Sequence, residues 1–309
     1  MRRFKNILVV VDDVTGSQPA VDAAAVLGAR NGARLTMVGL VEMSAANRIV
    51  KLSDGSEADV AGLLAEERRR DLEDIAAQLD LESVEIDVVA GVGFVEIVKR
   101  IQRDGHDIVF CSPSGGDTHG LAGSSLVMHL LRKSPVPVWV ETPRGDPSPD
   151  VAVALGPFGT GDDRLNQRLV ELSGSLAAIR QGTLHLVHAW RLEGETLLRR
   201  GRVRRPASQV DELVEAVHLE AAANMKHFAE RAQPFGVPCE VHLERGRPGA
   251  VIPQTIADIR PGVVVLGTLA RTGLQGMFMG NTAEQILGVV EASVLAAKPD
   301  DFISPIPPD

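Results

Sequence analysis

Aromatic residues are scarce in this chain, and tyrosine is absent. Only 3% of the 309 residues are aromatic, whereas 44% are hydrophobic. The cores must therefore be built from Val, Leu, Ile and Ala. Parallel strands buried on both faces have this aliphatic character. The composition thus favours an α/β protein, and the length suggests two domains of roughly 150 residues each.

Cysteine pairs and long apolar runs are also missing. The two cysteines, Cys111 and Cys239, lie in different halves, which excludes a disulfide framework and favours a reducing compartment. No apolar run approaches the roughly 18 residues of a membrane-spanning helix. The N-terminus holds no apolar segment long enough for export. We therefore expect a cytoplasmic protein with no membrane insertion.

The chain has no surplus of positive charge. Its net charge is −9, shared almost evenly between residues 1–145 and 146–309. An acidic average field disfavours binding to nucleic acid. Signatures of catalysis are absent too, because the sequence has no G-x-S-x-G, no H-E-x-x-H and no cysteine or histidine spacing typical of metal sites. We therefore expect no metal and no catalytic residues.

The chain repeats one alternation of strands and helices. In the first half, strands are expected near 5–11, 34–41, 84–90, 107–111 and 136–141, and helices near 17–31, 57–80, 93–104 and 123–133. In the second half, strands are expected near 150–156, 183–189, 239–243, 263–267 and 292–297, and helices near 161–181, 207–234, 249–259 and 280–290. This rhythm predicts parallel sheets with right-handed crossovers. The expected domains are 1–143 and 150–299, joined by a proline-rich linker at Thr142–Asp150 and followed by a tail at 300–309.

A glycine-rich stretch follows the fourth strand of the second half. Residues Gly267–Glu284 read GTLARTGLQGMFMGNTAE, with the last glycine directly before a helical pattern. Free backbone N–H groups ahead of a helix form an anion site, and glycine lets a ligand approach the backbone. The stretch therefore predicts room for a phosphate. The alternative is a plain connection whose glycines serve packing alone.

This stretch resembles the universal stress protein family, whose members carry G-x-x-G, nine residues and then G-[S/T] at this place. Here the pattern is Gly267-x-x-Ala270, nine residues and Gly280-Asn281-Thr282, so that Ala270 departs from the family glycine. The opening run Asn6–Asp12 and the closing Ser293–Leu295 with Lys298-Pro299 also look like the family. The G-N-T-A-E form is similar to tandem, two-domain (E-type) members.

The resemblance implies two tandem domains of the universal stress protein, or adenine nucleotide alpha hydrolase-like, fold. Each would be a five-stranded parallel sheet of order 3-2-1-4-5 flanked by helices, with a ligand crevice between strands one and four. It implies an adenine nucleotide such as ATP as the ligand. It also implies an intramolecular pseudo-dimer through the two fifth strands, Val136–Val140 and Val294–Ala297. Two-fold pairing of two chains into a homodimer is a further expectation.

The parts of an ATP site are divided between the halves. In family members that bind ATP, the acid closing strand one contacts the adenosine part and the loop holds ribose and phosphates. The second half keeps most of the loop but has Gly156 in place of Asp12. Its candidate nucleotide-binding residues are Gly267, Thr268, Ala270, Arg271, Gly280, Asn281 and Thr282.

The first half keeps Asp12 but has a degenerate loop. Ser114, Ser124 and Ser125 stand at the positions of Ala270, Gly280 and Asn281, and Asp117 adds negative charge. We therefore expect a vestigial, empty site there, formed by Asp12, Ser114, Ser124 and Ser125. The alternative for Asp12 is a carboxylate that caps the next turn.

Other patterns favour ordinary structural roles. The basic run Arg199–Arg205 is interpreted as a solvated loop, with anion recognition as the alternative. His185 and His188 are three apart on an expected strand, so they point to opposite faces and cannot share one metal. Cys111 is interpreted as a small buried filler, with reactivity as the alternative.

Two hypotheses of function remain. The first is a non-enzymatic stress-response binding module with adenine-nucleotide binding in the second domain. The second is an ATP-binding switch or slow ATPase. The presence of nucleotide in the purified protein would separate a binding role from a scaffold without ligand.

Overall fold

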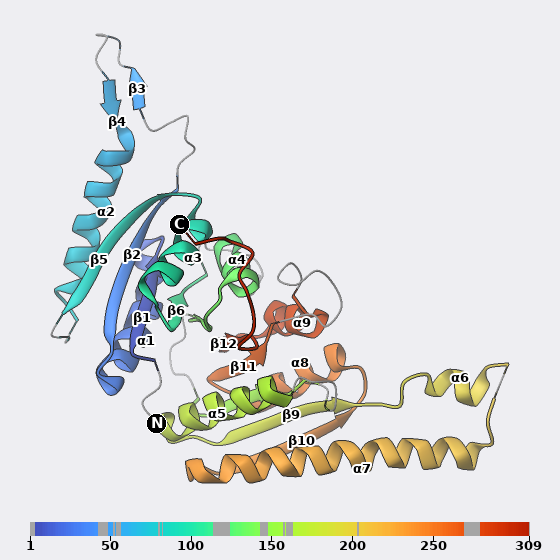
Figure 1. Cartoon of the computed structure of the whole chain (residues 1–309). Coiled ribbons are helices and arrows are strands. Elements are labelled where there is room, and N and C mark those ends of the chain that lie inside the picture. The colour runs from blue at the N-terminus through green and yellow to red at the C-terminus, as the bar shows by residue number, and fades with distance from the viewer. Residues whose placement is uncertain are drawn as a thin grey trace. The chain divides into compact units, whose positions relative to one another are not determined.

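The protein's structure is a computed structural model (Figure 1). It describes residues 4–42, 49–51, 53, 57–79, 81, 83–113, 124–142, 148–156, 158, 163–202, 204–268 and 279–308. The chain forms two compact units. The first comprises Met1–Gly145, Thr268–Gly280 and Ser293–Asp309, and the second comprises Asp146–Gly267 and Asn281–Ala292.

The first unit is an α/β layer structure. Its elements are β1 (Asn6–Val11), α1 (Val14–Asn31), β2 (Arg34–Glu42), β3 (Ile49–Lys51), β4 (Glu57–Asp59), α2 (Val60–Ala76), β5 (Val84–Gly91), α3 (Gly93–Asp104), β6 (Ile108–Cys111), α4 (Ser125–Lys133), β7 (Val138–Val140) and β12 (Ser293–Ala297). The sheet order is β12-β7-β6-β1-β2-β5, in which only β12 is antiparallel to its neighbour. The five parallel strands therefore follow the order 3-2-1-4-5.

Aliphatic strands and capped helices explain this architecture. Every residue of β1, β6 and β7 is buried, as continuous apolar strands between two helical layers should be. Right-handed crossovers place α1 and α2 on one face of the sheet and α3 and α4 on the other (Figure 1). Helix α1 begins at the cap Asp13, whose carboxylate accepts from the backbone N–H of Gly16, and ends at Gly32 in the left-handed conformation.

The second unit repeats the pattern. Its elements are β8 (Val151–Ala154), α5 (Asp163–Arg180), β9 (Leu184–Trp190), α6 (Glu195–Arg200), α7 (Ala207–Ala232), the 3-10 turn η3 (Gln233–Phe235), β10 (Cys239–Arg245), α8 (Pro248–Ile259), β11 (Val263–Gly267) and α9 (Asn281–Val289). The strands run parallel in the order β10-β9-β8-β11. Helices α5 and α7 lie on one face, and α8 and α9 lie together on the other (Figure 1).

Two local expectations were wrong, and one pair of strands was not predicted. The helix expected from residue 57 begins at Val60, because residues 57–59 form β4 against β3 and the Asp59 carboxylate then caps the helix through the N–H of Gly62. The hairpin of β3 and β4 was not predicted. The basic run after β9 was expected in a loop, but its first two arginines close the short helix α6.

The fifth strand of each sequence half lies in the first unit. Strand β12 pairs antiparallel with β7, with Leu295 opposite Trp139. Beside this pair, the Ser293 hydroxyl donates a 2.7 Å hydrogen bond to the Glu141 carboxylate. Strands β7 and β12 are therefore hydrogen-bonded neighbours within the first unit.

Candidate functional site

A cavity of about 580 Å³ lies at the carboxyl ends of the strands in the first unit. It is lined by Asp12, Leu40, Val41, Leu64, Glu67, Arg68, Asp71, Ser124, Ser125 and Leu126. Three of the four residues expected at a vestigial site thus share one cavity, next to the point between β1 and β6 where the strand order reverses. The fourth, Ser114, lies outside the described residues.

Asp12 lines this cavity and also accepts hydrogen bonds from the turn that follows β1. The Ser17 hydroxyl and the Asp13 backbone N–H donate to its Oδ1 at 3.0 and 2.9 Å, while Asp13 serves as the cap of α1. Burial raises the pKa of the Asp12 carboxyl, because an apolar surrounding disfavours the charged form. The two hydrogen bonds oppose that shift.

The first cavity is poorly suited to a phosphate. The Ser124 hydroxyl accepts from the backbone N–H of Val127, so the start of α4 already has its cap. Three carboxylates and one guanidinium line the walls, belonging to Asp12, Glu67, Asp71 and Arg68. Such a surplus of negative charge repels a polyphosphate.

The corresponding place in the second unit is the point between β8 and β11. These strands are parallel neighbours with Ala154 opposite Leu266. Where Asp12 stands in the first half, the N–H of Gly156 donates a 3.0 Å hydrogen bond to Oδ1 of Asn166. Asn166 is only 1% exposed, and its Nδ2 has no hydrogen-bond partner among the described residues. Asn166 was not predicted, because nothing in its position on α5 marks it as reaching the end of β8.

Gly267 closes β11 at a place where an added side chain would displace a neighbour by a few tenths of an ångström. A Cβ there would lie 3.0 Å from Cδ2 of Leu165, which belongs to the same unit. The candidates Asn281 and Thr282 form the first turn of α9, where backbone N–H groups lack intrahelical acceptors. Ala270 and Arg271 lie outside the described residues.

Thr268 carries a buried polar atom without a partner. The residue is 2% exposed, and its hydroxyl has no hydrogen-bond partner in the described part of the chain. Its backbone is fixed, because its N–H donates to the carbonyl of Ala297 at 3.2 Å and its carbonyl accepts from the N–H of Gly280 at 3.2 Å. The equivalent residue of the first half, Ser112, is likewise 2% exposed, and its hydroxyl has no partner among the residues that the structure describes. An orphaned buried hydroxyl costs free energy unless a ligand supplies its partner.

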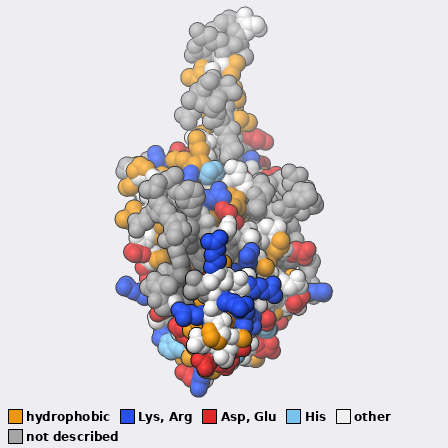
Figure 2. All heavy atoms as spheres, turned by 90° about the vertical axis from the view of Figure 1, so that its right-hand side faces the viewer, with side chains coloured by type: hydrophobic (Ala, Val, Ile, Leu, Met, Phe, Trp, Pro, Cys, Tyr) orange, Lys and Arg blue, Asp and Glu red, His pale blue; other side chains and the backbone are white. Residues whose placement is uncertain are grey.

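The positive charge of the basic run Arg199–Arg205 is partly neutralised by acidic side chains. Arg199 on α6 contacts Glu195 and Asp211 at 2.9 and 2.7 Å. Arg202, Arg204 and the adjoining Arg205 are exposed. Figure 2 shows Lys and Arg side chains, with acidic ones among them, gathered on the side that faces right in Figure 1. The solvated interpretation fits these contacts, and anion recognition stays a prediction.

The histidines of β9 occupy different faces, as expected, but one of them has partners the sequence did not reveal. His188 lies buried, with Nδ1 3.2 Å from the carbonyl oxygen of Leu155. His185 meets His242 and Glu240 of β10. Only the pairing of β9 with β10 brings these residues together, and the alternating positions of His242 and Glu240 on an expected strand were the available signal.

The two cysteines differ in exposure. Cys111 is 1% exposed, and burial raises the pKa of its thiol, which matches the interpretation of a buried filler. Cys239 is exposed, and both thiols are free. Among the helices described, none combines the length and the apolar character needed to cross a membrane.

Comparison with known proteins agrees with this architecture. The model of the universal stress protein family matches residues 3–141 and again 158–298. Universal stress protein E of Escherichia coli K12 is 29% identical over 319 residues, covering 99% of this chain and 98% of the relative.

Two solved structures share the fold over almost the whole chain. A functionally unknown protein from Pseudomonas aeruginosa PAO1 has a TM-score of 0.70 at 22% identity, covering 97% of this chain and 95% of its own. A universal stress protein from Archaeoglobus fulgidus has a TM-score of 0.64 at 17% identity, covering 95% and 98%. The repeated match, the full-length relative and the two α/β units together show that the chain belongs to the universal stress protein family, as a tandem, two-domain (E-type) member.

Proposed function

We propose that this stress-response protein is a non-enzymatic binding module whose second half binds an adenine nucleotide. The ligand would contact the backbone of Gly267 and Thr268, and of Gly280, Asn281 and Thr282. Ala270 and Arg271 complete the proposed residues from the sequence motif. The first half, with Asp12, Ser114, Ser124 and Ser125, would remain without nucleotide.

The observation that carries the proposal is the buried hydroxyl of Thr268 within the glycine motif, which has no hydrogen-bond partner among the described residues. A hydroxyl in this position can donate to a phosphate or ribose oxygen. In the second unit, the free Nδ2 of Asn166 offers another donor at the end of β8. Asn281 begins a helix, and the N-terminal end of a helix attracts anions.

The first half offers the opposite electrostatics. Its helix start is capped by Ser124, and its cavity contains three carboxylates against one guanidinium. The buried hydroxyl of Ser112 matches that of Thr268, so the difference between the halves lies in charge and capping. This asymmetry supports nucleotide binding by the second half alone.

The first experiment looks for the ligand in the protein as purified. The full chain is denatured, and the supernatant is separated by anion-exchange chromatography. A stoichiometry of one adenine nucleotide per chain is expected when the protein is saturated. No detectable nucleotide, together with no binding of ATP, ADP or AMP in calorimetric titrations, would overturn the proposal.

A matched pair of variants tests the half that binds. Thr268→Val removes the orphaned hydroxyl without changing the side-chain shape, so stability should be kept while nucleotide affinity falls. A hydrogen bond to a charged group is worth about 1.5–3 kcal/mol, or roughly tenfold to a hundredfold in affinity. Ser112→Ala is the control in the first half and should leave the affinity unchanged. If Ser112→Ala lost nucleotide affinity and Thr268→Val did not, the nucleotide site would lie in the first half, and the proposal would be wrong.

A substitution in the glycine motif gives an independent readout. Gly280→Leu should abolish binding, because a branched side chain would stand where the backbone must approach the phosphates. Ser124→Ala is its counterpart in the first half, and this variant should bind nucleotide as well as wild type does. A phosphate-release assay on the same proteins separates the two hypotheses, since a slow ATPase would lose turnover in Gly280→Leu and a simple binding module would show none at the outset.

The proposal extends to assembly and location. Pairing of β7 with β12 supports an intramolecular pseudo-dimer of the two sequence halves. A homodimer of whole chains is proposed from the frequency of two-fold assembly, and light scattering would test it by a mass of twice 32.9 kDa. A cytoplasmic location is proposed from the two free thiols, and cell fractionation would test it.

A further inference from the structure

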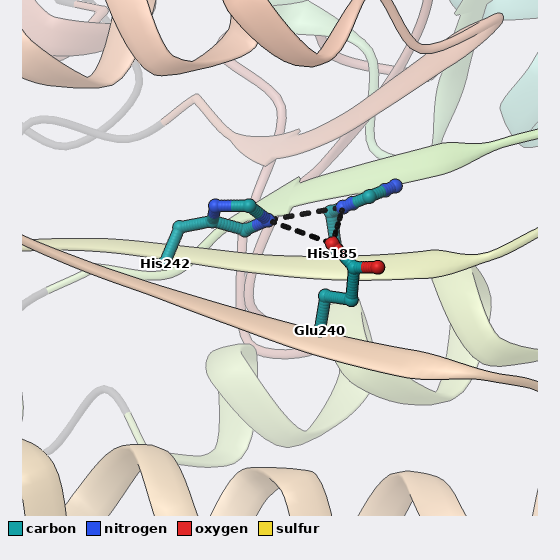
Figure 3. Close-up of side chains that lie close together, drawn as sticks. All are labelled: His185, Glu240 and His242. Atoms are coloured by element: carbon teal, nitrogen blue, oxygen red, sulfur yellow. Dashed lines mark hydrogen bonds and ion pairs between the residues drawn. The ribbon is translucent and has the colours of Figure 1, made fainter.

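Three side chains with metal-binding atoms meet on one face of the sheet in the second unit. His185 is on β9, and Glu240 and His242 are on β10 (Figure 3). The strands pair in parallel with Glu240 opposite His185, and His242 follows two residues later. Since side chains alternate along a strand, both β10 residues project to the same face as His185.

The distances between their ligand atoms suit a single small cation. Nδ1 of His185 lies 3.0 Å from Nε2 of His242 and 3.5 Å from Oε2 of Glu240. Nε2 of His242 lies 3.9 Å from the same Oε2. Ligand atoms bound at 2.0–2.1 Å to a tetrahedral ion are about 3.3 Å apart. The three observed separations bracket this value, so shifts of a few tenths of an ångström would place one ion in contact with all three atoms.

The surroundings favour positive charge. The cluster borders a cavity of about 660 Å³ between the sheet and α8. The acidic residues along its walls are Asp150, Glu240, Glu244 and Asp258, and none of the described residues lining it is Lys or Arg. The Glu240 side chain is 62% exposed and that of His242 is 24% exposed, so the cluster is open to solvent on one side. A water molecule could therefore complete the coordination.

We propose that His185, Glu240 and His242 bind one divalent transition-metal ion of the Zn²⁺ class. Two imidazole nitrogens and one carboxylate oxygen are ligands that Zn²⁺ accepts, with a fourth position left to water. Imidazole ligands also suit Co²⁺ and Ni²⁺ and disfavour Ca²⁺ and Mg²⁺, which prefer oxygen. Hydrogen-bonded strands hold the ligands, so the site does not depend on a loop.

The metal site is separate from the proposed nucleotide site. His185 and Glu240 are each the second residue of their strand, at its amino end. The nucleotide crevice is expected beyond the carboxyl ends of the strands. The five steps along the strand from His185 to Trp190 span about 16 Å. Metal binding and nucleotide binding can therefore be tested independently.

The experiment uses the full-length protein, stripped with EDTA and titrated with ZnCl₂ by calorimetry. One ion per chain is expected in wild type, with a matching rise in melting temperature. Co²⁺ should give the visible absorption bands of a tetrahedral complex. Glu240→Gln and His242→Gln are the test variants, because both side chains are partly exposed and should be replaceable without unfolding. Each should weaken Zn²⁺ binding at least tenfold.

Two control variants exclude other ligands. His227→Gln changes an exposed histidine on α7, and Cys239→Ser removes the exposed thiol that precedes Glu240 and points to the opposite face. Both should keep wild-type affinity. The proposal is overturned if wild type binds no Zn²⁺ stoichiometrically, if both test variants bind as well as wild type, or if Cys239→Ser abolishes binding. Suppose that Zn²⁺ does not change the melting temperature of wild type, while His242→Gln melts at a lower temperature than wild type without metal. The two histidines would then form only a stabilising hydrogen bond, and the metal proposal would be wrong.

Discussion

Lys298, at the end of β12, is a buried amine whose replacement should stabilise the protein. The residue is 5% exposed. Its Nζ donates a 2.9 Å hydrogen bond to the carbonyl oxygen of Ser134 and lies 4.9 Å from the centre of the Phe302 ring. Burial lowers the pKa of this amine from its ordinary 10.5 to about 7, because desolvation disfavours the ammonium form. At neutral pH the unfolded chain keeps a proton on the Lys298 amine, and the folded chain holds that proton less tightly, which lowers the free energy of unfolding.

The size of the effect follows from this pKa. Each pKa unit corresponds to about 1.4 kcal/mol, so the fall in the Lys298 pKa from 10.5 to about 7 removes about 4–5 kcal/mol of stability at pH 7 and below. As pH rises from 7 to 10.5, the unfolded chain still binds the proton and the folded chain does not, so stability increases. Lys298→Met abolishes this term but leaves the Ser134 carbonyl without its donor, at about 1–3 kcal/mol. We expect the variant to be about 1–4 kcal/mol more stable at pH 7 and less stable than wild type at pH 10.

Urea denaturation at a series of pH values between 6 and 10 measures the difference. A Trp190→Phe background leaves Trp139 of β7 as the fluorescent reporter in the same unit as Lys298. Lys226→Met, at an exposed position of α7, is the control and should not alter the pH dependence. The free-energy difference between wild type and Lys298→Met should change by about 3–4 kcal/mol from pH 7 to pH 10. A difference that stays constant over that range would refute the reasoning.

Three further predictions concern packing, titration and thiol exposure. Gly182→Ala should lower the free energy of unfolding by about 2 kcal/mol, because its Cβ would lie 2.2 Å from a backbone carbonyl oxygen of the linker. Gly288→Ala in α9 meets no atom within 4 Å and should raise the free energy of unfolding by up to about 1 kcal/mol. Thermal denaturation compares the two variants. The raised pKa of Asp12 means that stability is lost as pH rises from 3.8 through that pKa, so urea midpoints of Asp12→Asn should vary less than wild type above pH 3.8. A thiol reagent should modify Cys239 in the native protein and Cys111 only after unfolding, and equal rates for both would contradict the burial of Cys111.

The class of fold was predictable from composition and pattern alone. Scarce aromatics, aliphatic strands and two copies of one strand–helix rhythm were enough to predict parallel sheets in two halves, because buried parallel strands need continuous apolar runs. The glycine motif beginning at Gly267 carried the family resemblance. Two acids follow β1, and the cap of α1 is Asp13, while Asp12 lies at the cavity. Neighbouring acids compete for one cap, and sequence alone does not choose between them.

Tertiary structure decided which distant residues meet. His185 and His242 are 57 positions apart, and only the pairing of β9 with β10 in one register brings their nitrogens to 3.0 Å. A slip of one residue would have sent His242 to the opposite face of the sheet. Likewise, the low pKa of Lys298 arises from burial beside Ser134, which lies 164 positions away. Register and burial are properties of packed elements, so no local pattern could have supplied them.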